Sequence, residues 1–262
     1  MIRKLGYRPD AHDPRDQNAE ERLGAAVPPA SATLRPWVYE VLDQGALGSC
    51  VANAIMQAVR VSHIRQEQAG GAPNPAPPLG SRLFAYYLSR AIHHQTGEDA
   101  GTFLRTCFAA LNKFGFPPES VWSYDDGPDK FKRMPATAAF REAFDQRTPT
   151  VYRRISSTGS ARVTDIKRAI AAGYPVCFGT DVSTAFASNQ VTGLIGPPNP
   201  TDEIAGGHAL LAVGYDSDAF EVVNSWGEGW GNKGWCRLSP EYLMWSGTRD
   251  LWIVESAPLY SE

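Results

Sequence analysis

The chain has 262 residues, a net charge of −3 and 20% charged residues, which is the composition of a globular protein long enough to bury a sizeable core. Its weak negative charge gives no electrostatic support to nucleic-acid binding. No apolar run approaches the length of a membrane-spanning helix. We therefore expect neither a nucleic acid nor a membrane as partner.

The first 34 residues predict an extended arm. They contain little periodic apolar sequence and are interrupted by Pro9, Pro14 and the Ala-Pro run up to Pro29. The first ten residues become polar before the apolar region of a signal peptide could form. We expect a cytoplasmic protein, or one exported without a Sec signal peptide.

A helical pattern then begins at Cys50 and continues to about residue 66, with apolar residues on most of its circumference. A cysteine in the first turn of a helix meets unpaired backbone N–H groups and the positive end of the helix dipole, and both favour the thiolate. Cys50 is thus a candidate nucleophile. A small buried cysteine that only packs is the alternative, because free cysteines are often buried.

The rest of the chain divides into a helical half and a strand-rich half. After a Gly-Pro loop over 70–78, Ser81 is expected to cap a helix that runs to about residue 91, and a further helix over 103–111 ends at Gly115. A polar connection over 125–150 leads to a short helix over 164–172. Strands are predicted over 174–179, 209–213, 220–223, 235–238 and 251–254.

The other histidines and cysteines show no metal-site spacing. The four cysteines are scattered without a Cys-x-x-Cys pair, and adjacent His93 and His94 rarely face one ion. We expect these two, together with His12 and His63, to be exposed. No metal and no cofactor are predicted.

Two downstream blocks supply the partners that a thiol nucleophile needs. His208 follows two glycines and opens an apolar run, and Asn224 ends the next such run in the sequence Asn-Ser-Trp-Gly. A base and an orienting amide complete such a site. Asp216 is an alternative orienting group, although a turn before the next strand is its more ordinary role.

These three blocks resemble those of papain-like (cathepsin-like, C1-type) cysteine peptidases, in a bacterial-type form. Gln-Gly-x-x-Gly-Ser-Cys, Gly-His-Ala and Asn-Ser-Trp-Gly-x-Gly-Trp-Gly occur in the order of that family. The resemblance implies an α+β fold of two lobes with the active-site cleft between them. The peptidase domain would span 35–262, with a helical lobe over about 45–140 and an antiparallel, β-barrel-like lobe over about 145–262.

The resemblance also implies a role for each motif residue. Cys50 and His208 would rest as a thiolate–imidazolium pair and hydrolyse peptide bonds through an acyl-enzyme. Asn224 would orient the imidazole under the cover of Trp226. The Gln44 side chain and the Cys50 backbone N–H would form the oxyanion hole.

Substrate-binding positions follow from the same resemblance. The chain departs from the family at two positions. Secretory members usually carry a disulfide cysteine at the position of Leu47, and the family in general carries tryptophan at the position of Val51. Val254 is a candidate for the base of the main pocket, and a bulky apolar residue is expected two positions before the cut. The residues expected to line the substrate site are Gly48, Ser49, Gly101, Gly206, Gly207, Ala209, Trp226 and Trp230.

Two further readings stay open at this point. One is a binding protein built on an inactive protease scaffold, and the other is a Cys-His amidase or acyltransferase. The expected partner is a peptide or protein substrate. We also expect the arm over residues 1–34 to lie partly over the cleft as an intramolecular inhibitory segment.

Overall fold

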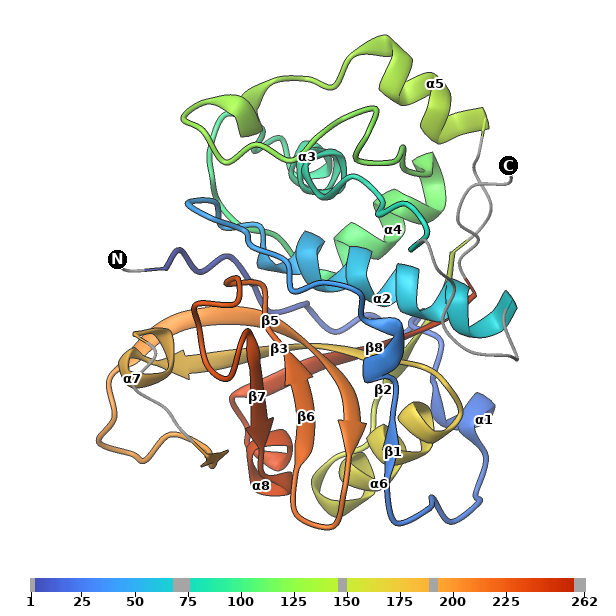
Figure 1. Ribbon diagram of the computed structural model, residues 1–262, viewed down its shortest axis with the longest axis vertical. Helices are drawn as coiled ribbons and strands as arrows, with labels where there is room; N and C mark the ends of the chain where they lie inside the picture. The colour runs from blue at the N-terminus through green and yellow to red at the C-terminus, as the bar shows by residue number, and fades with distance from the viewer. Residues whose placement is uncertain (1–2, 68–75, 146–149, 189–192, 257–262) are drawn as a thin grey trace.

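The computed structural model describes residues 3–67, 76–145, 150–188 and 193–256. Its first half forms a helical lobe, drawn in blue-green to green in Figure 1. This lobe contains α2 (Cys50–Glu67), α3 (Arg82–Ile92), α4 (Leu104–Phe114) and α5 (Thr137–Asp145).

Local sequence sets the limits of these helices. The Ser81 side chain accepts a hydrogen bond from the Phe84 backbone N–H and so caps α3. Gly115 ends α4 with a φ of 69°, a conformation that a residue without Cβ adopts readily. Both signals were predicted correctly. Helix α2 is buried on nearly all sides because it lies between the two lobes.

The second half builds a mostly antiparallel sheet whose strands follow the order β2-β8-β3-β5-β6-β7-β4. The short strand β1 (Ala32–Thr33) pairs with β5, and β4 pairs with β7 in parallel. Within the described residues the two end strands do not pair, so the barrel-like lobe is an open, curved sheet. The strands are β2 (Val151–Ile155), β3 (Val176–Ser183), β4 (Leu194–Ile195), β5 (Ile204–Tyr215), β6 (Phe220–Val223), β7 (Trp235–Leu238) and β8 (Thr248–Ser256).

Helices cover the sheet where it does not meet the other lobe. Helix α6 (Gly159–Ala171) contacts β5 and α8 (Pro240–Met244), while α7 (Thr184–Ala187) follows β3 directly. Helix α2 packs against β5 and β8, which brings its first turn beside the strand that carries His208. The α+β, two-lobe architecture expected from the sequence is confirmed.

Several local expectations need correction. The connection over 125–150 contains α5, whose Ala139 and Ala143 are buried, and the helix expected at 164 begins at Gly159. His63 is 7% exposed instead of solvated, because α2 is buried on nearly all sides, its polar residues included. Most of the Gly-Pro loop at 70–78 lies outside the described residues. The limits proposed for the two lobes stay a prediction.

The arm is largely extended, as expected. Among its described residues, 3–34, the named elements are the short helix α1 (Glu20–Leu23) and β1, and the 3-10 turn η1 (Arg35–Trp37) follows directly after it. In the part of the chain that the structure describes, no helix is long and apolar enough to cross a membrane.

Candidate active site

Cys50 is the first residue of α2 and has no exposed surface. Its sulfur is hydrogen-bonded by backbone groups of Ala209 and Gly6, besides its own turn of helix. Ala209 directly follows His208 in β5. The helix start and the histidine strand therefore meet, although they are 158 positions apart in the sequence.

The imidazole of His208 is held from one side by Asn224. Its Nε2 lies 2.7 Å from the Asn224 Oδ1, and the indole of Trp226 stacks on the ring with centroids 4.2 Å apart. The Asn224 Oδ1 also accepts the Ser225 backbone N–H, which fixes the amide. The Nδ1 atom of His208 is buried and has no hydrogen-bond partner within the described residues. It is the nitrogen left for chemistry.

Gln44 forms hydrogen bonds with residues of both lobes. Its backbone N–H donates to the Ser225 carbonyl, and its Oε1 accepts the Ser225 hydroxyl at 2.8 Å. Its Nε2 donates to the Leu47 carbonyl and, at 3.0 Å, to the carbonyl of Lys4 in the arm. One amide hydrogen of Gln44 therefore points at a carbonyl oxygen that occupies the cleft.

Burial shifts the pKa values of Cys50 and His208 in the directions that favour their neutral forms. It raises the pKa of the Cys50 thiol to about 11, more than the hydrogen bonds from Ala209 and Gly6 lower it. Burial likewise lowers the pKa of His208 to about 4, while Asn224 acts in the opposite direction and Arg3 adds a repelling positive charge. Both shifts favour the neutral forms while the two groups are buried, and the expected thiolate–imidazolium pair stays a prediction.

The excluding element is the arm, which runs through the cleft as an extended strand. Thr102 donates its backbone N–H to the Gly6 carbonyl at 2.8 Å and accepts the Arg8 N–H at 3.0 Å, while the Tyr7 N–H donates to Gly207 at 3.1 Å. The arm thereby bridges an edge of the helical lobe and strand β5. A side chain on Gly6 would overlap with the carbonyl of Gly48.

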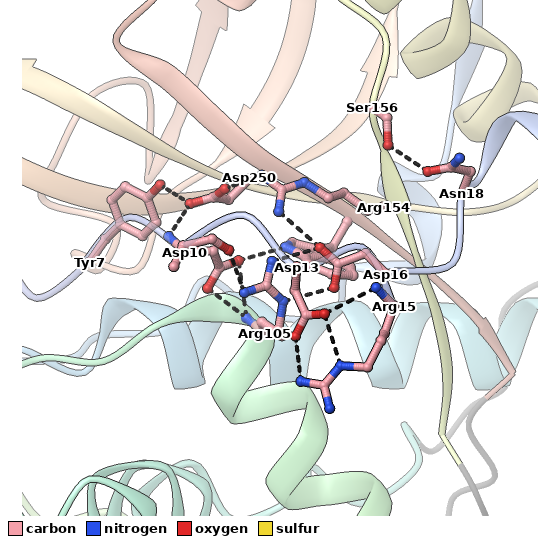
Figure 2. A network of polar contacts seen from close by, with 12 residues as sticks. Tyr7, Asp10, Asp13, Arg15, Asp16, Asn18, Arg105, Arg154, Ser156 and Asp250 are labelled. Carbon is pink, nitrogen blue, oxygen red and sulfur yellow. Dashed lines mark hydrogen bonds and ion pairs between the residues drawn. The ribbon is translucent and has the colours of Figure 1, made fainter.

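Beyond the cleft, an ionic network fastens the arm to both lobes (Figure 2). Arg105 of α4 forms a bidentate pair with Asp16, at 2.6 and 2.8 Å, and donates its backbone N–H to Asp10. Arg154 of β2 bridges Asp16 and Asp250. Because Arg105 and Arg154 belong to different lobes, this network ties the arm and the lobes together.

The remaining predicted positions differ in what they touch. Gly48 and Gly101 flank the arm at Gly6, and a Cβ on Gly101, whose φ is 69°, would overlap with the Gly6 carbonyl. Gly206 contacts Leu5 of the arm. Ser49 and Trp230 face inward: Ser49 bonds Tyr124, and the Trp230 indole donates to the Phe186 carbonyl.

Sequence reasoning missed the contributions of Tyr7, Thr102 and Asp250. Tyr7 is 5% exposed and its hydroxyl reaches Asp250 at 2.5 Å. Asp250 therefore lies at the far end of the Tyr7 side chain, and the role expected for Val254 stays a prediction. The sequence around Asp250, a lone aspartate before the apolar run 251–254, does not indicate that its side chain lies near Tyr7. Strand pairing alone places it there.

A helix-borne cysteine, a histidine held by an asparagine and a glutamine amide facing the cleft, placed between a helical lobe and an antiparallel sheet, define the class of papain-like thiol proteases. Family comparison agrees. The model of the papain family cysteine proteases matches residues 93–249, more than half of the chain, and these include His208 and Asn224. The chain belongs to the papain family of cysteine proteases.

Individual relatives support this assignment. An uncharacterised peptidase C1-like protein of Acanthamoeba polyphaga mimivirus is 36% identical over 229 residues, which are 84% of this chain and 71% of the relative. A cathepsin L-like proteinase of Fasciola hepatica is 24% identical over 78% of this chain and 57% of its own length.

Solved structures show the same fold. Xylellain, a cysteine protease of Xylella fastidiosa, superposes with a TM-score of 0.84 at 29% identity, covering 99% of this chain and 97% of its own. A digestive procathepsin L 3 of Tenebrio molitor superposes with a TM-score of 0.66 at 18% identity, covering 96% of this chain and 75% of its own.

Proposed function

We propose that this protein is a cysteine endopeptidase in which Cys50 is the nucleophile and His208 the general acid and base. The thiolate attacks the peptide carbonyl carbon, the C–N bond breaks, and the imidazolium delivers its proton to the departing amine. Water then hydrolyses the thioester, with His208 accepting the proton from that water. Asn224 positions the ring throughout.

Gln44 and the Cys50 backbone N–H are the proposed oxyanion hole. The Gln44 Nε2 donates to an arm carbonyl at 3.0 Å, the kind of contact that a substrate oxyanion requires at this place. Donors fixed beforehand stabilise the developing negative charge without reorganising. One observation carries the proposal. The His208–Asn224 pair lies beside Cys50 at the start of α2, and the Cys50 sulfur reaches the backbone of Ala209, the residue after His208 in β5.

We further propose that the arm inhibits the enzyme by occupying the substrate cleft. The group of the arm at the Cys50 sulfur is the Gly6 backbone, which hydrogen-bonds it, and the arm carbonyl at Gln44 belongs to Lys4, two residues earlier. The arm thus meets the sulfur and the Gln44 amide through two different residues.

Release of the arm would readmit water and substrate to the pair. The desolvation that holds the pKa of Cys50 high and that of His208 low would then be relieved, since burial is the largest cause of both shifts. The helix start and the neighbouring imidazole then favour the thiolate–imidazolium form. In this proposal, access to the cleft controls the protonation state.

The test is the rate at which iodoacetamide alkylates Cys50 in the full-length chain, followed by peptide mass mapping. Gly6→Ala cannot seat its arm, because the new Cβ would overlap with the Gly48 carbonyl. We expect this variant to be alkylated at least about tenfold faster than wild type and to cleave a denatured protein substrate. Gly97→Ala, where an added Cβ meets nothing within 4 Å, is the matched control and should behave as wild type.

Replacing His208 distinguishes an enzyme from a binding protein built on the same scaffold. The complete burial of Cys50 and His208 favours that second candidate, because a permanently seated arm would leave only a binding surface. In the Gly6→Ala chain, His208→Ala should slow alkylation at neutral pH and abolish cleavage. Equal alkylation rates with and without His208, and no cleavage in either chain, would establish the binding protein instead.

A further inference from the structure

The side chain of Tyr7 occupies a pocket lined by glycines. Gly179 of β3 and Gly207 of β5 form its walls, and a Cβ on either would overlap with Tyr7. The two glycines lie diagonally on one face of the β3–β5 pair, because Gly179 pairs with Ala209 and Gly207 pairs with Asp181. Figure 2 shows the phenol directed at Asp250, to which its hydroxyl donates at 2.5 Å.

This pocket adjoins the reacting atoms. Gly6 lies at the Cys50 sulfur, and Tyr7 is the next residue along the arm. The Tyr7 N–H bonds the carbonyl of Gly207, which directly precedes His208. A peptide stretched along the same strand would therefore place in this pocket the side chain of a residue adjacent to the one at the sulfur.

The base of the pocket is the buried carboxylate of Asp250, whose two oxygens have different partners. The Asp250 side chain is 2% exposed, and its Oδ1 is paired with Arg154 at 2.6 Å. Its Oδ2 accepts two hydrogen bonds, and both come from the arm: the Tyr7 hydroxyl and the Asp10 backbone N–H at 2.6 Å. When the arm leaves, Oδ2 loses both donors. A buried acceptor without a donor is costly, so the next occupant of the pocket is selected for a donor at that depth.

The charge at the base is already balanced. Arg154 neutralises Asp250, and the adjacent Arg249 is paired with Asp181. The remaining carboxylate nearby, Asp10, belongs to the arm and departs with it. A cationic side chain in this pocket would therefore lose its hydration without gaining an unpaired anion, whereas a neutral phenol supplies the missing donor.

Resting on the proposed peptidase function, we infer that Asp250 is a specificity-determining residue that makes this pocket select tyrosine over both phenylalanine and arginine. The expected position is two residues before the cut, the one assigned to Gly206, Gly207 and Ala209. Tyr7 of the arm, which occupies the pocket in this structure, is an example of the side chain that the pocket selects. A purely apolar preference, as expected from the sequence, overlooks the carboxylate.

The experiment uses full-length Gly6→Ala protein and peptides that differ only at the second position before the cut, which is tyrosine, phenylalanine, O-methyltyrosine or arginine. We expect kcat/KM for tyrosine to exceed that for phenylalanine about tenfold or more, since a site built to bind a hydroxyl discriminates against its absence. O-methyltyrosine keeps the ring and oxygen but lacks the donor, so it should fall to or below phenylalanine. Arginine should also fall below tyrosine.

A second variant tests the carboxylate itself. Adding Asp250→Ala to the Gly6→Ala chain should reduce the tyrosine-to-phenylalanine ratio towards one, with folding checked by thermal unfolding. The O-methyltyrosine comparison needs no mutation at Asp250 and stands even where this variant fails to fold. Cleavage that prefers phenylalanine or arginine would overturn the inference and leave the peptidase function intact. No cleavage of any peptide, with Cys50 alkylated at the same rate with and without His208, would overturn both.

Discussion

Gln44 is a single side chain that contacts both lobes and the arm. Its Oε1 is held by Ser225 of the sheet lobe, which leaves Nε2 aimed at the cleft. The orientation of that amide is thus determined by hydrogen bonds at both of its ends, from Ser225 of the sheet lobe and to Leu47 of its own loop. A donor fixed in this way is suited to stabilising an oxyanion.

Replacing Gln44 by alanine in the Gly6→Ala chain should lower kcat about a hundredfold or more, with a smaller change in KM, because the lost donor acts mainly in the transition state. Steady-state kinetics on one peptide measure both constants. Gln57→Ala removes a comparably buried glutamine of α2, whose amide donates to the Glu40 carbonyl away from the cleft. That control should lower the melting temperature and keep kcat; an equal loss of kcat in both variants would remove Gln44 from the oxyanion hole.

Among the elements, the arm combines substrate-like contacts with a charged anchor. Asp10 lies between Asp250, Trp252 and Arg105, and burial followed by repulsion from Asp250 raises the pKa of Asp10 to about 7, against a smaller opposing effect of Arg105. The ordinary aspartate pKa is near 4. A carboxyl whose pKa is raised on docking holds its proton more tightly when the arm is seated. We therefore expect the contribution of Asp10 to docking to be largest below about pH 4 and to decrease as the pH rises towards 7.

The pH dependence of docking can be isolated from that of the thiol. We expect the ratio of Cys50 alkylation rates, wild type over Gly6→Ala, to rise between about pH 4 and pH 7, since only wild type can seat its arm. Asp10→Asn keeps a neutral group at every pH and should make this ratio nearly constant over the same window. A ratio that falls with rising pH in wild type would contradict the assignment to Asp10.

Across the whole molecule, the two lobes share one hydrophobic core that includes residues of α2, α4 and the sheet. The fully buried guanidinium of Arg90 organises the loop beside this core. It donates to the carbonyls of Tyr86, Gln95, Thr96, Glu98 and Phe131. The loop carries Asp99, Gly101 and Thr102, which form the edge against which the arm lies.

Substituting Arg90 by methionine should lower the free energy of unfolding by about 3 kcal/mol, because five carbonyls lose the hydrogen bonds of a fully buried guanidinium. Urea unfolding followed by tryptophan fluorescence and by far-UV circular dichroism measures this. Both signals should change in one transition, as expected of a shared core. Arg141→Met on the exposed face of α5 is the control and should change stability by less than about 0.5 kcal/mol. Two separate transitions in the wild-type protein would contradict a shared core.

Local sequence specified the parts of this protein that depend on neighbouring residues. The helix that begins at Cys50, the cap at Ser81, the end at Gly115 and the strand that carries His208 follow from short-range spacing and from turn chemistry. The three motif blocks also predicted which residues gather at the cleft, as far as Gln44, His208 and Asn224 are concerned. His63 was misjudged, because the periodicity of a helix does not show whether its polar residues are covered by the rest of the fold.

Only the tertiary structure decided how the site is occupied and what lies at the base of its pocket. Tyr7 and Asp250 are 243 positions apart, and their contact depends on strand register and on the path of an arm without periodic sequence. The pKa shifts of Cys50 and His208 likewise follow mainly from burial and not from their motifs. The sequence determined the chemical groups, whereas the fold determined their access to water, because exclusion of solvent requires segments that only folding brings together.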